Sequence, residues 1–121
     1  MHISIQGELY MSEQPSQQVQ QWLSQAQMYQ QQLQQVVVQK EQMKLQLAEV
    51  KKALEELEKT KEDVYKIAGP ILVKSTKDDI KKDLHDKSEL LEVRVKTLEK
   101  SESKLKSQFE ELKERVSKLN K

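Results

Sequence analysis

Side chains that commonly carry catalysis are sparse in this 121-residue sequence. Cysteine is absent, and histidine occurs only as His2 and His85, far apart and outside any partner motif. No serine lies in a nucleophile-elbow motif, and no glycine-rich phosphate loop is present. The acidic residues alternate with lysines, as on a solvated helical surface, so no pair of carboxylates has a reason to be desolvated. We therefore expect no enzyme activity, no catalytic or cofactor-binding residues, no metal site and no cofactor.

The balance of charge argues against two further classes of protein. The chain has 21 Lys and Arg residues against 20 Asp and Glu residues, for a formal net charge of +1. No basic excess is available to neutralise a run of phosphates, so we expect no nucleic-acid partner. No apolar stretch approaches the roughly 18–20 residues that span a bilayer, and the first seven residues lack the pattern of a secretory signal. A chain without cysteine fits a reducing compartment, and we expect a cytoplasmic location without a membrane partner.

The overall composition is typical of long helices. Apolar residues make up 36% of the chain and charged residues 34%, whereas globular domains average about 45–50% and about 25%. With two glycines and two prolines, the chain has too few turn-forming residues for a many-stranded β fold. The sequence therefore predicts a mainly α protein.

A seven-residue repeat runs through the first of two stretches that lack glycine and proline. Alternating steps of three and four residues select twelve positions there, and all but Lys40 are apolar or aromatic. Sustained patterning with charged flanks predicts a coiled coil. The predicted seam of the first helix consists of Val19, Trp22, Ala26, Tyr29, Leu33, Val36, Lys40, Met43, Leu47, Val50, Leu54 and Leu57.

The second stretch repeats leucine every seven residues, with mixed companion positions between the leucines. These companions are Ser88, Val95, Glu102, Phe109 and Val116. The same argument predicts a second coiled-coil helix. Its leucines are Leu84, Leu91, Leu98, Leu105, Leu112 and Leu119.

Glutamine dominates the first helix, with fifteen glutamines in residues 14–46. Such a tract can be disordered and prone to aggregation. Here the glutamines lie mostly between seam positions, and glutamine is a good helix former. We therefore predict a helix with a neutral polar face.

The residues between the two helices, 64–75, have a different character. Gly69-Pro70 is a turn signal, and both sides of it carry β-branched and aromatic residues. We predict a β-hairpin with about five residues per strand. Proline is poorly suited to the second central position of a tight two-residue turn, so we expect a turn of three or four residues. Lys66 and Lys74 interrupt the apolar runs, as in strands with one wetter face.

These elements predict one domain over residues 13–121, after an extension at 1–12 that we expect to be disordered. The helices are expected over about 16–63 and about 77–120, with the hairpin over about 64–75 and Ser75 or Thr76 as the second N-cap. Because a hairpin reverses the chain, the two nearly equal helices should pack antiparallel as a two-helix coiled coil.

The predicted hairpin has no third strand in its own chain. A lone two-stranded hairpin is marginal in water, and its edges leave backbone groups unpaired. Strands from other subunits should therefore complete the sheet. The apolar residues that such an assembly would cover are Val64, Ile67, Ile71, Leu72 and Val73.

The order of these elements and the residues of the hairpin resemble those of a known family. A long helix ending in Leu54-Glu55-Glu56-Leu57, the segment from Val64 to Lys74 (Val-Tyr-Lys-Ile-Ala-Gly-Pro-Ile-Leu-Val-Lys) and a second long helix are similar to the β-type subunit of prefoldin, especially the archaeal form. The resemblance covers about residues 12–120, and the hairpin segment is its most specific part. A single hairpin indicates the β-type subunit, since the α-type has two.

The resemblance implies a subunit of an ATP-independent holding chaperone. In that family two α-type and four β-type subunits form a hexamer whose hairpins join into a double β-barrel. Unfolded polypeptides are held at the ends of the coiled coils and passed to a group II chaperonin. The residues that match the family's assembly segment are Val64, Tyr65, Ile67, Ile71, Leu72 and Val73.

By the same resemblance, the client-binding tips would be built from both ends of the chain. Seam residues such as Trp22, Tyr29 and Val116 could equally serve only to pack the coiled coil, whereas Leu23 and Met28 lie beside the seam. The expected tip residues are Val19, Trp22, Leu23, Met28, Tyr29, Phe109, Val116 and Leu119.

Two other classes remain open from the residues alone. A structural coiled coil would use the helices as a spacer and dimerise through the hairpin. An adaptor would bind one specific helix along its seam. A dimer in native mass measurements would favour the spacer, and a mixed hexamer would favour the chaperone.

Overall fold

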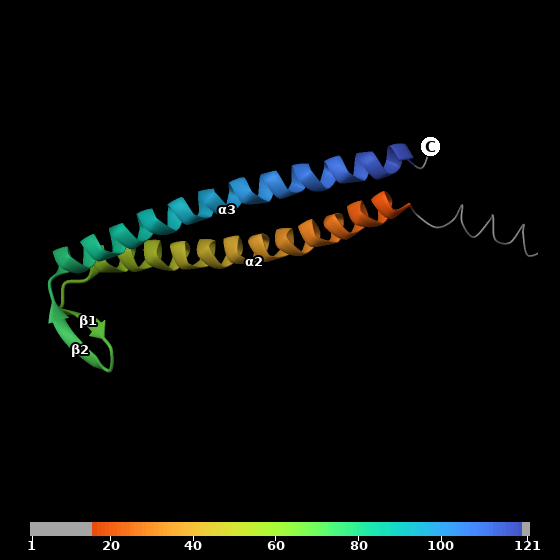
Figure 1. Ribbon diagram of the computed structural model, residues 1–121. Helices are drawn as coiled ribbons and strands as arrows, with labels where there is room; N and C mark the ends of the chain where they lie inside the picture. The colour runs from red at the N-terminus through yellow and green to blue at the C-terminus, as the bar shows by residue number, and fades with distance from the viewer. Residues whose placement is uncertain (1–15, 120–121) are drawn as a thin grey trace, which may run out of the picture. The chain divides into compact units, whose positions relative to one another are not determined.

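The computed structural model describes residues 16–119, and the extension predicted at 1–12 lies outside them. The described chain forms α2 (Gln17–Lys59), β1 (Val64–Ala68), β2 (Ile71–Ser75) and α3 (Lys77–Leu119) in that order (Figure 1). Each helix has 43 residues and each strand has five. The prediction of two long, equal helices joined by one antiparallel hairpin is confirmed.

The described chain divides into two units, and both helices contribute to each. The hairpin unit consists of residues 36–101 and contains both strands, and the terminal unit consists of residues 16–35 and 102–119. In the hairpin unit two ion pairs join α2 to α3. Lys51 Nζ lies 3.7 Å from Glu92 Oε1, and Lys81 Nζ lies 2.6 Å from Glu58 Oε1. Residue numbers rise along α2 as they fall along α3, so the helices of this unit are antiparallel.

The core of the described chain is the predicted apolar seam. Its buried hydrophobic residues all belong to the seams inferred from the heptad pattern, and Leu91 is only 2% exposed. Every predicted seam residue of α2 is buried or half-buried, as are those of α3 except Leu119. The buried hydrophobic side chains are Val19, Val50, Leu57, Leu91, Val95 and Leu112.

Both helices begin at a hydroxyl N-cap. The Ser16 Oγ accepts a hydrogen bond from the Val19 N–H at 3.2 Å, and the Thr76 Oγ1 accepts one from the Asp79 N–H at 3.1 Å. Each bond satisfies one of the amide donors that a helix start leaves without a partner. Of the two caps predicted for the second helix, the structure selects Thr76.

The first helix ends at Lys59, four residues before the predicted end at 63. The Thr60 N–H is shared between the carbonyl oxygens of Glu56 (3.1 Å) and Leu57 (3.2 Å). Lys77 Nζ, from the start of α3, donates to the carbonyl oxygens of Glu58 (3.1 Å) and Thr60 (3.2 Å). A cation that bonds the last carbonyls stabilises a helix end. This cap comes from the other helix, so the local helix propensity of residues 60–63 does not reveal it.

The turn of the hairpin is tighter than predicted. Ala68 pairs with Ile71, so Gly69 and Pro70 alone form the loop, and the expectation of three or four turn residues is wrong. Gly69 has a φ of 60°, which suits the first central position of a type II′ turn. The second central position of that turn has a negative φ, which proline's ring favours. The objection to proline holds for a type I turn, where the preceding residue must be α-helical.

The pairing places Lys66 and Lys74 on opposite faces of the hairpin. Lys66 faces Val73 across the ladder, and Lys74 faces Tyr65. Because side chains alternate along a strand, one face carries Lys66 and the other carries Lys74. The expectation of a single wetter face is therefore wrong, and both faces combine one lysine with apolar side chains.

Candidate functional site

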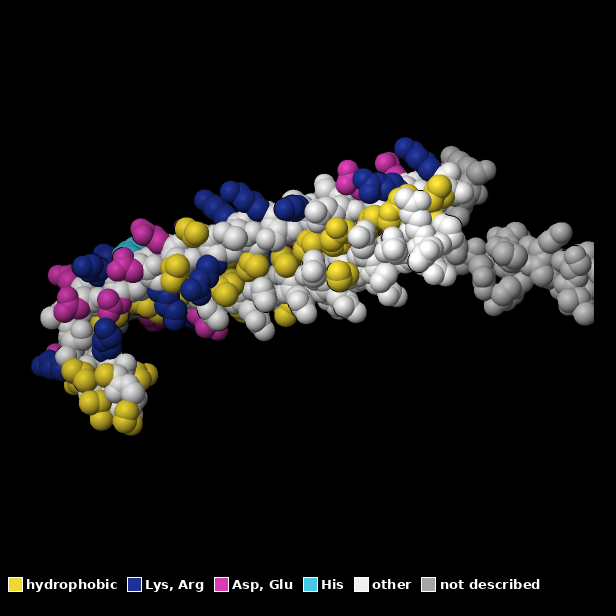
Figure 2. All heavy atoms as spheres, in the orientation of Figure 1, with side chains coloured by type: hydrophobic (Ala, Val, Ile, Leu, Met, Phe, Trp, Pro, Cys, Tyr) yellow, Lys and Arg dark blue, Asp and Glu magenta, His cyan; other side chains and the backbone are white. Residues whose placement is uncertain are grey.

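The hairpin exposes most of its apolar side chains. Within the described chain its sheet has two strands, each with one unpaired edge. Ile67 is 76% exposed and Leu72, its partner across the ladder, is 68% exposed. Figure 2 shows hydrophobic side chains gathered over both strands. The exposed large residues of the hairpin are Tyr65, Ile67, Ile71, Leu72 and Val73, which are five of the six predicted assembly residues; Val64, at the base, is half-buried.

Two exposed ion pairs involve the lysines of the hairpin. Lys66 Nζ donates to Asp83 Oδ2 of α3 at 2.8 Å, and Lys74 Nζ lies 3.4 Å from Asp63 Oδ2, just before β1. The hydrogen bond to Asp83, with the attraction of that carboxylate, raises the pKa of Lys66. The hairpin therefore has one polar contact with α3, while most of its apolar side chains remain exposed.

A second polar cluster lies where α2 ends and α3 begins. The hydrogen bond and charge of Lys81 lower the pKa of Glu58, and Glu58 in turn raises the pKa of Lys81. Lys77 adds two bonds to the last carbonyls of α2. Together these contacts link the C-terminal end of α2 to the N-terminal end of α3, next to the two strands.

The terminal unit contains an apolar cleft between its two helices. The cleft has a volume of about 680 Å³, and apolar atoms make up most of its wall. This volume lies in the range of sites that bind drug-sized ligands, which is about 300–1,000 Å³. The lining residues are Leu23, Ala26, Gln27, Gln30, Phe109, Leu112, Lys113, Val116 and Ser117.

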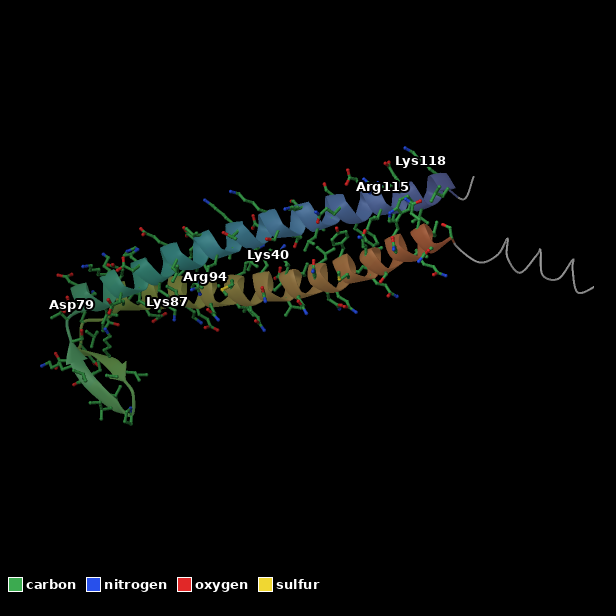
Figure 3. All side chains as sticks on the ribbon, in the orientation of Figure 1. Lys40, Asp79, Lys87, Arg94, Arg115 and Lys118 are labelled. Carbon is green, nitrogen blue, oxygen red and sulfur yellow. The ribbon has the colours of Figure 1, made fainter. Side chains whose placement is uncertain are left out.

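One cation lies at this cleft. Lys113 Nζ is 5.6 Å from the centroid of the Phe109 ring and 3.8 Å from Glu110 Oε1. The ammonium group therefore lies near an aromatic face at cation–π distance. By contrast, Lys118 points away from α2 in Figure 3. The α2 wall of the cleft carries no charge, because residues 16–35 contain no Lys, Arg, Asp or Glu.

The predicted tip residues fall into two groups. Leu23, Phe109 and Val116 line the cleft. The others lie outside its lining: Met28 and Leu119 are exposed, Trp22 and Tyr29 are half-buried in the seam, and Val19 is buried.

Two of the remaining lining residues, Ala26 and Leu112, belong to the predicted seam but were not expected at the tip. The other four lie beside the seam, which is why sequence reasoning missed them. The cleft residues of α2, from Leu23 to Gln30, and those of α3, from Phe109 to Val116, follow steps of three, four and seven residues. That spacing marks one helical face. A search for a second such face beside the seam would have found Gln27, Gln30, Lys113 and Ser117.

Among residues 16–119, no group of three or more His, Cys, Asp or Glu side chains is placed to hold a metal ion. Neither long helix has a stretch apolar enough to span a bilayer.

Comparison with known proteins gives consistent likenesses. The family model described as "Prefoldin subunit" matches residues 20–121. The chain is 46% identical over 55 residues to the prefoldin subunit beta of Saccharolobus islandicus, covering 46% of this chain and 44% of that protein. It is 47% identical over 55 residues to that of Methanococcus vannielii, covering 46% of this chain and 49% of that protein. The chain thus spans about half the length of the curated relatives it matches, or slightly less.

A solved structure extends the likeness over nearly the whole fold. The crystal structure of the prefoldin beta subunit from Thermococcus strain KS-1 matches with a TM-score of 0.83 and 43% sequence identity. The match covers 88% of this chain and 96% of that chain.

Proposed function

The chain belongs to the prefoldin family of chaperone subunits, and from that premise we propose that it holds unfolded polypeptides without ATP. In this proposal it is the β-type subunit of a hexamer with two α-type and four β-type chains. The hexamer would pass its clients to a group II chaperonin, in the cytoplasm. The stoichiometry, the α-type partner and the chaperonin follow from the family resemblance.

The exposed hairpin supports assembly. Prefoldin β subunits form oligomeric complexes, and this hairpin offers free strand edges with apolar side chains on both faces. Fully burying a side chain such as Ile67 or Leu72 contributes about 1.5–3 kcal/mol. Neighbouring hairpins would supply that burial and pair the open edges, which removes the liability of a lone two-stranded sheet. An intersubunit β-barrel satisfies both needs.

The apolar cleft of the terminal unit is the observation that best supports the binding of unfolded clients. An unfolded client presents apolar side chains without a fixed geometry, so its site must accept them at many angles. The cleft joins apolar side chains such as Leu23 and Val116 to the amide groups of Gln27 and Gln30. Amides donate and accept hydrogen bonds, which suits the exposed backbone of an unfolded chain.

Each such contact is weak, and avidity would supply the strength. One client side chain buried in the cleft contributes about 1.5–3 kcal/mol, less than the roughly 8 kcal/mol of micromolar affinity. Several subunits in one complex would bind the same client at several points, which raises the overall affinity without new contacts.

A matched pair of variants tests this site. Leu23 and Leu45 are both exposed leucines on α2, at 47% and 64%, but only Leu23 lines the cleft. In the assembled complex, Leu23→Gln should weaken the suppression of aggregation of chemically denatured citrate synthase, while Leu45→Gln should leave it unchanged. Glutamine retains helix propensity in both variants.

The measurement is light scattering without ATP, repeated with a second unrelated client. If the two variants suppress aggregation equally well, the cleft is not the site that binds clients. A dimer by native mass spectrometry, even with an α-type partner present, would instead favour a structural coiled coil that dimerises through its hairpin.

A further inference from the structure

The apolar cleft of the terminal unit carries charge on its α3 wall and none on its α2 wall. Among the described residues, Lys113 of α3 is the charged side chain of the lining, whereas the α2 wall consists of Leu23, Ala26 and two glutamines. The acidic residues of this part of α3 are exposed and lie outside the lining: Glu110, Glu111 and Glu114. A ligand in the cleft therefore meets a cation beside the apolar groups and no lining carboxylate.

Two contacts describe the position of the ammonium group. Lys113 Nζ lies 5.6 Å from the centroid of the Phe109 ring, which itself lines the cleft, and 3.8 Å from Glu110 Oε1. The Lys113 side chain is 60% exposed, so an incoming anion can reach it. An exposed ion pair such as that with Glu110 is weak. A carboxylate on a bound ligand can therefore compete with Glu110 for the ammonium group.

The surface of α2 next to the cleft is neutral. A smaller hollow of about 390 Å³ is lined by Gln20, Leu23, Ser24 and Gln27, so it shares Leu23 and Gln27 with the cleft. A chain that continues from the cleft onto α2 meets amide and hydroxyl groups, which both donate and accept hydrogen bonds and favour neither sign of charge. The charge that can discriminate between ligands therefore lies on the α3 wall.

We propose that the cleft prefers client segments in which an acidic residue lies two positions from an apolar residue. The apolar side chain packs beside Phe109 while the carboxylate pairs with Lys113. In an extended chain, side chains two residues apart lie on the same face, about 6.6 Å apart, which is close to the 5.6 Å between Lys113 Nζ and the Phe109 ring. This preference rests on the proposed function, because it concerns which unfolded segments the cleft binds.

Three synthetic peptides test the preference. The first contains Leu-Ser-Asp in a background of serine and glycine, the second has the same composition with the aspartate moved to the far end, and the third contains Leu-Ser-Lys. The peptides are immobilised densely, so that several subunits of one assembled complex bind at once and avidity makes weak contacts measurable. Biolayer interferometry should show the first peptide bound about two- to fivefold more tightly than the other two, as for an exposed ion pair.

Three variants show whether Lys113 causes this difference. Lys113→Gln should abolish it, and Glu110→Gln should widen it, because the competing carboxylate is gone. Lys118→Gln removes the same charge from an exposed side chain outside the lining, so it should leave the difference unchanged. Added salt should reduce the difference in the unaltered complex, because salt screens exposed charges.

The outcomes separate this preference from the proposed function. Equal binding of the three peptides by the unaltered complex would overturn the preference and leave the cleft as a client site that does not select by charge. A difference that persists in Lys113→Gln would also overturn the preference, since its cause would lie elsewhere. If the complex binds none of the peptides, the preference and the proposed role of the cleft both fail.

Discussion

The hairpin unit and the terminal unit each bury an apolar seam, but they differ in the charged residues around it. In the hairpin unit, ion pairs join α2 to α3 and join β1 to α3. In the terminal unit, residues 16–35 carry no charge, so no ion pair can link the two helices there. Two ion pairs of the terminal unit, Lys106–Glu102 and Lys113–Glu110, lie within α3.

This difference agrees with the two roles proposed for the units. Directional contacts such as Lys66–Asp83 hold strands at a set position, which pairing with another sheet requires. A neutral wall of glutamine and apolar groups imposes no such geometry, which suits varied partners. The charge pattern along α2 therefore differs between the two units, as the proposed roles in assembly and in client binding would require.

The largest expected effect comes from the hairpin. Ile67→Asp with Leu72→Asp should convert the higher oligomer into monomers, because two unpaired carboxylates cannot be buried in a shared sheet. Helical content by circular dichroism should stay unchanged. Native mass spectrometry measures the outcome, with Val93→Asp, an exposed site on α3, as the control. An intact oligomer would show that assembly does not use this surface.

Seam truncations compare the two units directly. Leu91 and Leu112 are both buried, in the hairpin unit and the terminal unit respectively. Truncating each to alanine should lower the free energy of unfolding by about 2–5 kcal/mol for a well-packed leucine. Leu112→Ala should cost less, because Leu112 already borders the cleft and lies near a helix end. Urea denaturation checks this order, and an equal loss of unfolding free energy at both sites would contradict it.

Removing the cross-helix cap should have a smaller effect. Lys77→Met keeps the apolar stem but deletes both hydrogen bonds to the last carbonyls of α2. We expect a loss of about 1 kcal/mol, as for a solvent-accessible hydrogen-bonded group. Lys82→Met, an exposed neighbour on α3, serves as the control in the same urea measurement. A loss no larger than that of the control would mean that the cap contributes nothing to stability.

The smallest expected effect is the pH dependence of the Glu58–Lys81 pair. The pKa of Glu58 is lowered from 4.5 in the folded state, so its contribution is present above 4.5 and is lost as the pH falls through the folded value. The pKa of Lys81 is raised from 10.5, so its contribution is present below 10.5 and is lost as the pH rises through the folded value. Between these limits the pair should stabilise the fold slightly, since it is exposed.

A double-mutant cycle measures the coupling free energy between Glu58 and Lys81. Glu58→Gln, Lys81→Met and the double variant should give a small favourable coupling at neutral pH. The coupling should vanish in acid as Glu58 becomes protonated. A coupling that persists at pH values well below the folded pKa of Glu58 would contradict the assignment.

Much of the fold follows from local patterns. The heptad repeat identified the seam, because burial on a helix depends on spacing that the residues show directly. The hairpin followed from Gly69-Pro70 between β-branched runs. The two-residue turn differs from the predicted three or four residues because the positive φ of Gly69 permits proline at the second central position. The end of α2 was mispredicted because Lys77 supplies its cap from the next helix.

The amino-acid sequence alone determined which side chains are buried in the seam, where the chain reverses and which family it resembles. All three depend on spacing and residue type, which act locally. Only the tertiary structure decided the cross-helix ion pairs, the cap on α2 and the composition of the cleft. Each of these joins side chains far apart in the chain, and their meeting depends on how two helices pack.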